Sequence, residues 1–393
     1  MRIRTSLKAI ILLACTTTMS PSWAFFDLFS SNSIAAGSRY AFIPSKTEAR
    51  IVVIDTQSDK LAAELELNDI ANQLVISDSL DMLVATHSDS SILSLLNLET
   101  QQSLPSLDIG MIADTGLLHP HDQIMAFGNT QGQVSVWDMQ APKKMFQVDG
   151  LSNAVNLTFS VDGARLFVVE PEHRRISVIE LNARAIIAEI GIPKRARNDI
   201  NQSELIEVKL EISSISRSAD GHTGFLSITS ENTVVVLDLR KLEVKQTIAV
   251  DAEPVRPFST ADNRYVLIPH RAAESIYVLD ALSLNIRGNI KTGLPARELN
   301  TGWLDTVAFV MSANSEQIAV VDLEKLALER TITLSGNPDS GMVTSDSKRL
   351  YTALIDTNRV ARIDVRSREV LEISSNTNGL SNIEIAVSNN ICH

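Results

Sequence analysis

One short pattern recurs along almost the whole chain: an apolar run that ends at an acidic or amide residue. The Ile-Ala-Val-Val run at residues 318–321, followed by Asp322, is one copy. Aligned on the residue after the run, the copies end at Asp55, Asn97, Asp138, Glu180, Asp238, Asp280, Asp322 and Asp364. Their separations are 42, 41, 42, 58, 42, 42 and 42 residues. Such a period indicates a repeat architecture with one supersecondary unit per repeat.

The internal pattern of a repeat is clearest between residues 151 and 191. Four short runs at residues 154–160, 165–169, 176–181 and 185–190 are rich in Val, Ile and Phe and are bounded by turn residues. Runs of this length and composition predict strands, since helices are usually longer and carry a 3.6-residue period. Four antiparallel strands in about 42 residues match the size of a propeller blade.

The two ends of the chain predict how the ring of blades closes. The first copy has only three strand-like runs, at residues 39–43, 50–54 and 61–67, whereas the last copy has an extra run at residues 382–388. We expect the extra run to complete the first blade, because an unpaired strand edge invites aggregation. The prediction is an all-β, eight-bladed β-propeller in one domain spanning residues 39–389, or seven blades if one copy is irregular.

The order of the recurring residues resembles that of a known group of propellers. In the last repeat a Gly336-x-Pro338 step is followed by a turn and strand at residues 345–351, a third strand at 359–364 and an outer strand near 368–370. This order is similar to that of the YVTN-type β-propellers, in the superfamily of quinoprotein amine dehydrogenase heavy chains. The resemblance implies ligand sites around the mouth of the central channel. Trp137-Asp138 resembles a WD40 signature in one copy only.

The N-terminus is typical of an exported protein. Basic residues precede an apolar stretch at residues 9–14, and a small-x-small pattern ends at Ala24, which predicts a signal peptide at residues 1–24. An alternative is that Leu-Leu-Ala before Cys15 is a lipobox, which would leave Cys15 lipidated. The first route predicts a periplasmic or secreted protein, and the second an outer-membrane lipoprotein facing the periplasm.

No transmembrane helix is expected, because no apolar stretch reaches the roughly 18 to 20 residues that span a bilayer. Residues 25–38 are expected to form an N-terminal tail, either mobile or packed on the domain, or else a segment that docks a partner or touches a membrane. Residues 390–393 form a C-terminal tail. Cleavage after Ala24 would leave Cys392 as the only cysteine, so the product could form no intrachain disulfide.

Composition restricts the class of partner. Hydrophobic residues make up 44% of the chain and charged residues 21%, which suits a folded globular protein. The formal net charge of −12 argues against general affinity for nucleic acid or anionic membrane, which requires a net basic surface.

The blade topology sorts loop residues onto two faces. The turn between the second and third strands of a blade lies on the same face as the loops between blades, here named the top face, because antiparallel strands alternate in direction. The candidates for a ligand or partner site on this face are His87, His173, Arg174, Arg175, Lys194, Arg195, Arg197, Arg256, His270, Arg271 and Arg297. If they converge, they could bind a carboxylate, a phosphate or an acidic protein surface. Alternatively, they are dispersed or paired with Glu170, Glu172, Glu274 and Glu298.

Two further segments stand out from the repeat. An insertion at about residues 193–207 precedes the fifth copy and could be a lid, a partner contact or an inert extension. The His-Pro-His-Asp segment at residues 119–122 occupies a turn position on the opposite face, so we interpret it as a turn and predict no metal site there.

The sequence contains no motif that supports catalysis. A nucleophile elbow, a phosphate-binding loop, a His-Glu-x-x-His and a Cys-x-x-Cys are all absent from it. The leading hypothesis is therefore an exported, non-catalytic scaffold for a protein partner or a small anionic ligand, with no cofactor. The alternative, from the resemblance, is a cofactor-associated enzyme or subunit similar to quinoprotein dehydrogenase heavy chains, propeller lactonases or tetrapyrrole-binding propellers, for which His87, His173 or His270 could supply an axial ligand or base.

Overall fold

The computed structural model describes residues 39–194, 210–302, 304–312 and 314–386. The chain divides into two units, Met1–Ile34 and Ala35–His393, and the second unit is described here by itself. The expected leader and N-terminal tail, most of the insertion at 193–207, and the C-terminal tail lie outside the described residues. Within the described part, no helix has both the length and the apolarity needed to cross a membrane.

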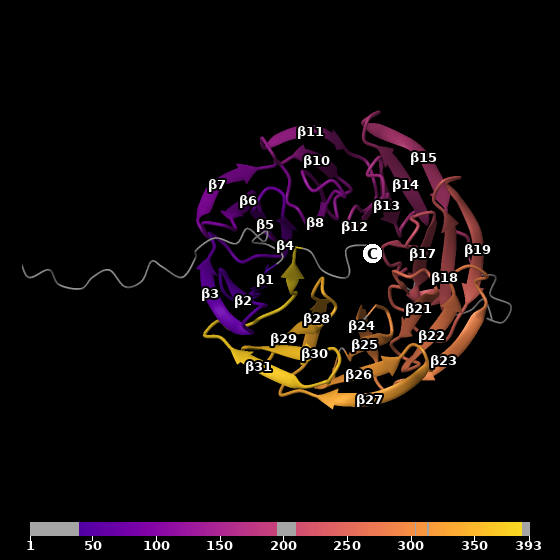
Figure 1. Cartoon of the computed structure of the whole chain (residues 1–393). Helices are drawn as coiled ribbons and strands as arrows, with labels where there is room; N and C mark the ends of the chain where they lie inside the picture. The colour runs from indigo at the N-terminus through magenta and orange to yellow at the C-terminus, as the bar shows by residue number, and fades with distance from the viewer. Residues whose placement is uncertain (1–38, 195–209, 303, 313, 387–393) are drawn as a thin grey trace, which may run out of the picture. The chain divides into compact units, whose positions relative to one another are not determined.

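The second unit is an eight-bladed β-propeller made of eight four-stranded antiparallel sheets (Figure 1). Blade 1 holds β1 (Tyr40–Pro44), β2 (Arg50–Asp55), β3 (Lys60–Glu66) and β32 (Glu384–Ile385). Blade 2 holds β4 (Gln73–Ser77), β5 (Met82–His87), β6 (Ser90–Asn97) and β7 (Ser103–Asp108). Blade 3 holds β8 (Thr115–Leu118), β9 (Ile124–Gly128), β10 (Val134–Asp138) and β11 (Lys143–Val148). Blade 4 holds β12 (Asn156–Phe159), β13 (Arg165–Glu170), β14 (Arg175–Glu180) and β15 (Ala185–Gly191).

The second half of the ring repeats the same order of strands. Blade 5 holds β16 (Ser216–Arg217), β17 (Thr223–Ile228), the short 3-10 helix η1 (Thr229–Glu231), β18 (Thr233–Asp238) and β19 (Glu243–Ala249). Blade 6 holds β20 (Phe258–Ser259), β21 (Tyr265–His270), β22 (Ser275–Asp280) and β23 (Ile286–Lys291). Blade 7 holds β24 (Ala296–Gly302), β25 (Val307–Ser312), β26 (Gln317–Asp322) and β27 (Ala327–Thr333). Blade 8 holds β28 (Pro338–Val343), β29 (Arg349–Leu354), β30 (Arg359–Asp364) and β31 (Val370–Ser374).

The recurring apolar run is the third strand of each blade, and both of its faces are buried. In β26, Ile318 and Val320 belong to the apolar cluster shared with blade 8, whereas Ala319 and Val321 belong to the cluster shared with blade 6. A strand covered on both faces needs apolar residues at every position rather than at every second one. This requirement explains why the run shows no alternation.

The residue that ends the run organises the following turn. The Asp322 Oδ1 accepts hydrogen bonds from the backbone amides of Glu324 at 3.0 Å and Lys325 at 2.8 Å. Asp238 and Asp364 make the same pair of bonds with amides two and three residues ahead. Short carboxylate and amide side chains favour such turns, so the recurring acid has an architectural role.

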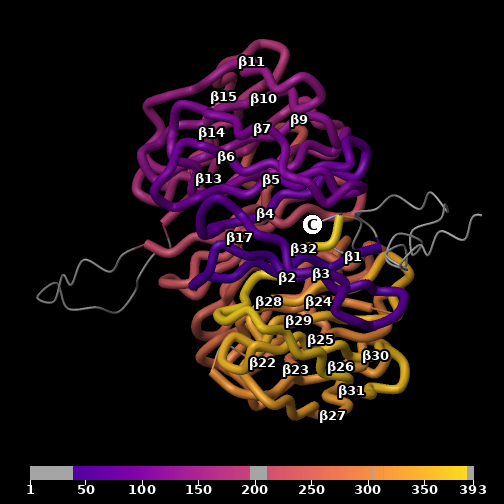
Figure 2. Tube along the Cα trace, turned by 90° about the vertical axis from the view of Figure 1, so that its left-hand side faces the viewer, coloured from indigo at the N-terminus to yellow at the C-terminus, as the bar shows by residue number. Residues whose placement is uncertain are grey.

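The predicted closure of the ring is confirmed. The order of strands in blade 1 is β3-β2-β1-β32, and β32 pairs with β1 through Ala41 to Ile385 and Phe42 to Glu384. Figure 2 shows the yellow β32 beside the indigo β1. In the described chain β32 comprises two residues, and the last two residues of the run expected at 382–388 lie outside the described residues.

The seam between blades 8 and 1 has polar contacts in addition to its apolar cluster. The Asp59 carboxylate lies in the turn after β2 and accepts a hydrogen bond from the Tyr351 hydroxyl. It also accepts two hydrogen bonds from the Arg362 guanidinium, at 2.7 and 3.0 Å. Arg349 approaches the same carboxylate at 3.4 Å. Burial, followed by the Asp59 charge, raises the pKa of Tyr351, so the hydroxyl keeps its proton and acts as the donor.

We expect Asp59→Ala to lower the free energy of unfolding by about 3 kcal/mol, because removing one member of a buried network leaves its partners uncompensated. Denaturant titration of the full chain measures this change. Alanine at the exposed Asp89 is the matched control and should change stability by less than about 0.5 kcal/mol. Equal stabilities of the two variants would contradict the role assigned to Asp59.

Candidate functional site

A buried position at the top end of every second strand accounts for several predicted site residues. The register of the sheets places the following residues there, blade by blade: Ser45, His87, Asn129, Glu170, Ile228, His270, Ser312 and Leu354. All eight are buried. Where the residue is polar, its side chain can hold the top loops against the blade.

His87 shows this use of the position. Its Nδ1 lies 2.9 Å from the Ile70 carbonyl in the preceding interblade loop, and its Nε2 lies 2.9 Å from the Ser94 hydroxyl on the third strand. Only 3% of the residue is exposed. Both ring nitrogens are therefore engaged inside the blade, which makes His87 a poor candidate for a ligand site.

Glu170 occupies the same position in blade 4 and draws in two predicted site residues. Its carboxylate accepts hydrogen bonds from Arg175 at 2.8 and 3.1 Å, from the Ser177 hydroxyl and from the Ser152 amide at 2.7 Å. Burial raises the pKa of Glu170, but these donors outweigh it and lower the pKa to about 2. His173 lies 3.5 Å from the same carboxylate. Arg175 and His173 are therefore paired with Glu170, which is the alternative to a ligand site that the sequence left open.

Arg174 has a separate set of partners. Its guanidinium pairs with Glu231 at 2.8 and 3.1 Å and donates to the carbonyl oxygens of Ile192 and Pro193. These contacts connect the top turn of blade 4 to that of blade 5. Arg174 therefore fixes loops and has little capacity left for a ligand.

His270 is fully buried at the strand-end position of blade 6. Its ring lies edge-on to Tyr277, with centroids 4.9 Å apart, and neither ring nitrogen makes a hydrogen bond to a described residue. Burial lowers its pKa to about 4. The ring is neutral near pH 7 and acts as an apolar filler behind the top surface.

Two further loop cations of the described chain, Arg271 and Lys194, make no contact with each other. Arg271 is exposed and pairs with Glu211 at 3.3 Å and Glu253 at 4.0 Å. Lys194 is exposed at the end of the described part of blade 4, and Arg195 and Arg197 lie outside the described residues.

On the inner strands, one register position joins neighbouring blades. On the inner strand, this position pairs with the residue of the second strand that comes just before the strand-end position. Gln73 holds it in blade 2 and Asn156 in blade 4. The Gln73 amide donates to the Gly116 carbonyl at 3.1 Å and accepts from the Gly116 amide at 2.9 Å. Asn156 donates to the Ile212 carbonyl at 3.1 Å. Amide side chains at this position therefore link one inner strand to the next.

Blades 6 and 7 carry opposite charges at this linking position. Glu298 pairs with Met311 in the sheet, and Arg256, two residues before Phe258, lies beside Pro269. Within the described residues, Arg256 makes neither a hydrogen bond nor an ion pair with Glu298 or with any other side chain. Arg256 therefore does not link its blade to the next one as Gln73 and Asn156 do. Its charge calls for a different explanation.

Electrostatics supports this interpretation of Arg256. Arg256 is exposed to solvent, although the protein around the inner strands lowers its pKa through desolvation. The nearby Glu298 opposes this shift and Arg217 reinforces it. The exposed guanidinium has no paired counter-ion among the described residues, so an anion beside it would gain charge-assisted hydrogen bonds.

Two carboxyls complete the group. Burial raises the pKa of Glu298 to about 7, although Asn300, Arg256 and Arg297 oppose the shift. Burial, with a contribution from the Glu298 charge, raises the pKa of Glu384 to about 8. We name Arg256, Glu298 and Glu384 the inner-strand cluster. Near pH 7 Glu384 is mostly protonated and Glu298 is about half ionised, so the two carboxyls offset the Arg256 charge only in part.

Arg297 borders the inner-strand cluster but is already paired. It forms an ion pair with Asp339 on β28, whose side chain is 1% exposed. Asp339 also accepts a hydrogen bond from the Asn382 amide at 3.0 Å and lies 3.9 Å from Lys46. Arg297 therefore connects blade 7 to blade 8, and Asp339 continues the connection to blade 1. Of the predicted residues in the described chain, Arg256 and Arg297 both influence Glu298, and His173 and Arg175 both lie beside Glu170.

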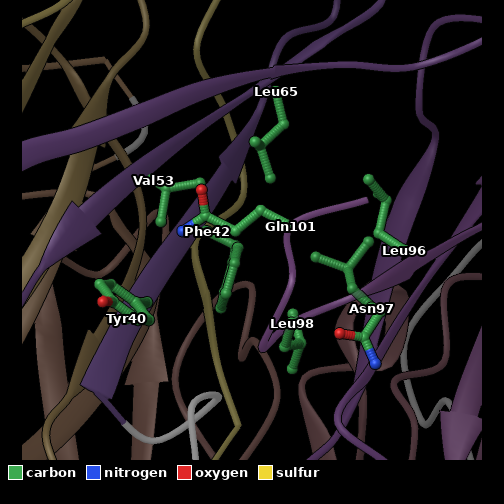
Figure 3. Close-up of a pocket in the computed structure, with 9 residues that line it drawn as sticks. Tyr40, Phe42, Val53, Leu65, Leu96, Asn97, Leu98 and Gln101 are labelled. Atoms are coloured by element: carbon green, nitrogen blue, oxygen red, sulfur yellow. The ribbon is translucent and has the colours of Figure 1, made fainter. Parts of the chain in front are cut away.

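The other histidines and the cavities of the described chain do not form a binding site. His119 uses its Nε2 on the Gly163 carbonyl at 2.9 Å, and no group of three or more His, Cys, Asp or Glu in the described chain could hold a metal. An apolar cavity of about 10 Å³ between blades 1 and 2 admits at most one water (Figure 3). A hollow of about 190 Å³ on the opposite face, between blades 7 and 8, has Glu329 paired to Arg368 and Asp322 paired to Lys325.

Comparisons with known proteins support the fold alone. No family model and no curated protein matches the chain. Among solved structures, the chain is similar to the dihydro-heme d1 dehydrogenase NirN in complex with DHE, with a TM-score of 0.73 and 12% sequence identity. The match covers 91% of this chain and 78% of that chain.

Glu384 and the cluster as a whole were missed at the sequence level, although Arg256 and Glu298 were both noted. The signal was present, since Arg256 and Glu298 are 42 residues apart and therefore share one position in successive repeats. Finding it requires aligning the inner strands, where the repeat is shortest and least regular.

We expect His270→Leu, which introduces the residue of blade 8 at this position, to remove a pH dependence of stability. The unfolded chain protonates near the ordinary histidine pKa of about 6.5, and the folded protein only near 4, so wild-type stability falls as the pH drops through this range. Relative to wild type, the variant should gain about 2 kcal/mol between pH 7 and pH 5 in urea titrations. The exposed His121→Leu should show no such gain, and parallel pH profiles for wild type and His270→Leu would refute the assignment.

Proposed function

We propose that this β-propeller is a non-catalytic binding scaffold that takes an anionic group, a carboxylate or a phosphate, at the inner-strand cluster on its top face. The single observation that carries the proposal is Arg256, a cation with no ion pair in the described structure at a position that links blades elsewhere. The anionic group can belong to a small molecule or to an acidic segment of a protein partner.

The charges around Arg256 favour an anion over a cation. Arg217 adds positive potential, and the Arg297–Asp339 pair is close to neutral. Near pH 7 Glu298 is about half ionised and Glu384 is mostly protonated, because burial raises the pKa of each. A planar guanidinium with unused donors can bind a carboxylate or phosphate through two parallel hydrogen bonds, which adds orientation to affinity.

A second candidate is a tetrapyrrole-binding or other cofactor-associated propeller. The fold similarity to NirN, whose structure contains DHE, and the order of repeat residues shared with YVTN-type and quinoprotein dehydrogenase-like propellers favour it. His87 and His270 are buried structural residues, and this weakens the candidate. A visible absorption band in the purified protein, or hemin binding that survives Arg256→Ala, would support it against the first proposal.

We also propose that the chain is exported, on the basis of its leader. The two processing routes give different mature N-termini, at Phe25 after cleavage behind Ala24 or at a lipidated Cys15. We expect mass spectrometry of the mature chain from a periplasmic extract to find Phe25 as the first residue. An intact Met1 in the cytoplasmic fraction would contradict export.

We expect Arg256→Ala to weaken sulfate binding at least about tenfold, because a hydrogen bond to a charged group contributes roughly 1.5 to 3 kcal/mol. Isothermal titration calorimetry at low ionic strength measures the affinity. Arg271→Ala is the matched control: it removes an exposed top-face arginine with its own acidic partners and should leave the affinity unchanged. Equal affinities of wild type and Arg256→Ala would remove the proposal.

A further inference from the structure

The top of blades 2 and 3 exposes three isoleucine side chains. Ile70 lies in the loop between blades 1 and 2, Ile92 near the top end of β6, and Ile112 in the loop between blades 2 and 3. Their exposed fractions are 39%, 46% and 38%. The loop that carries Ile112 begins beside Ile92, because the Ile109 amide donates to the Ser91 carbonyl at 3.0 Å. Large apolar side chains exposed together on neighbouring blades (Figure 1) indicate a contact surface, whereas a single one does not.

The fold holds the backbone beneath these isoleucines in place. The Ile70 carbonyl lies 2.9 Å from His87 Nδ1, and the Ile112 carbonyl accepts a hydrogen bond from the Asn129 side-chain amide at 3.2 Å. His87 and Asn129 are the buried strand-end residues of blades 2 and 3. Ile92 belongs to β6 and pairs there with a residue of β7. A surface that is already ordered loses little conformational entropy when a partner binds.

Carboxylates without a cationic partner surround the isoleucines. They are Asp69, Asp89, Asp108, Asp114 and Asp149. Within the described residues none of them forms an ion pair, and their hydrogen-bond donors are neutral, such as the Ser91 hydroxyl at 2.8 Å from Asp108 and the Gln133 amide at 3.0 Å from Asp149. The top loops and turns of blades 2 and 3 contain neither lysine nor arginine, at residues 67–73, 87–91, 108–115, 128–134 and 148–155.

Other parts of the top face pair their carboxylates inside the chain. Arg174 neutralises Glu231, and Arg297 neutralises Asp339. Lys144 of blade 3 influences Asp108 without pairing with it, since its ammonium group donates to Gln147 at 2.9 Å and lies over the Trp137 ring. The negative charge of blades 2 and 3 is therefore available to a partner.

We propose that the top of blades 2 and 3, named the blade 2–3 surface, docks a protein segment in which basic side chains surround apolar ones. The isoleucines would contribute affinity by burying apolar area, and the carboxylates would select a basic partner and speed its encounter. This surface lies on other blades than the inner-strand cluster of blades 6, 7 and 1. The inference thus goes beyond the proposed anion site and does not depend on it.

A synthetic amphipathic peptide of lysine and leucine is the probe, compared with a peptide of equal length and charge in which serine replaces leucine. Fluorescence anisotropy with the full chain should show the lysine–leucine peptide binding about tenfold more tightly. The double variant Ile92→Ser with Ile112→Ser should weaken this binding at least about tenfold. Ile286→Ser with Leu371→Ser is the matched control, because it removes similarly exposed side chains from the outer strands of blades 6 and 8 and should leave the affinity unchanged.

The charges are tested separately from the apolar side chains. Asp89→Asn with Asp149→Asn should weaken peptide binding about threefold and reduce its dependence on salt, whereas Glu274→Gln with Glu316→Gln, on blades 6 and 7, should change neither. Unchanged urea midpoints would show that the variants remain folded.

Three results would overturn the blade 2–3 surface: no binding of the lysine–leucine peptide, equal affinity for the two peptides, or equal affinities of wild type and the Ile92→Ser, Ile112→Ser variant. Self-association of the wild type that this variant abolishes, measured by sedimentation velocity, would assign the surface to a second copy of the chain and also overturn the proposal. Arg256→Ala should leave peptide binding unchanged, so failure of the anion site and failure of the blade 2–3 surface are distinguishable.

Discussion

The burial of both faces of every blade is the constraint on which this structure depends. The described residues form eight apolar clusters, and each one lies between two adjacent blades rather than inside one. A single four-stranded sheet cannot cover its own two faces, so no blade is stable without neighbours on both sides. The ring must close, and the pairing of β32 with β1 removes the last open edge.

The same constraint explains what the sequence could predict. The strands predicted at 165–169 and 185–190 were recognisable because strands of the same kind recur at a fixed spacing along the chain. The structure places β13 and β15 there, each with one extra residue at its end. The missing strand in the first copy predicted the closure correctly. The top-face histidines were harder to place, because a shift of one residue along the chain separates an exposed loop position from the buried strand-end position.

The candidate site was only partly predictable for a related reason. Glu170 and Arg175 read as loop charges in the sequence, yet the strand-end register buries the carboxylate and turns both into structural residues. Arg256 and Glu298 differ because, in blades 2 and 4, their register position carries amides that link one blade to the next. A charge that replaces a structural amide is informative, since it sacrifices a hydrogen bond between blades. Glu384 could be recognised only after β32 was paired with the first blade.

The polar seam at Asp59 also bears on how many blades the ring contains. Apolar interfaces between similar repeats are nearly interchangeable, so a chain of such repeats could in principle join its ends after a different number of copies, or join the end of another molecule. Asp59, Tyr351 and Arg362 connect the first blade to the last one with directional hydrogen bonds, a set of partners that the described interfaces between the other blades do not share. The seam therefore favours pairing of the last blade with the first blade of the same chain, because another repeat offers no carboxylate in the place of Asp59 to Tyr351 and Arg362.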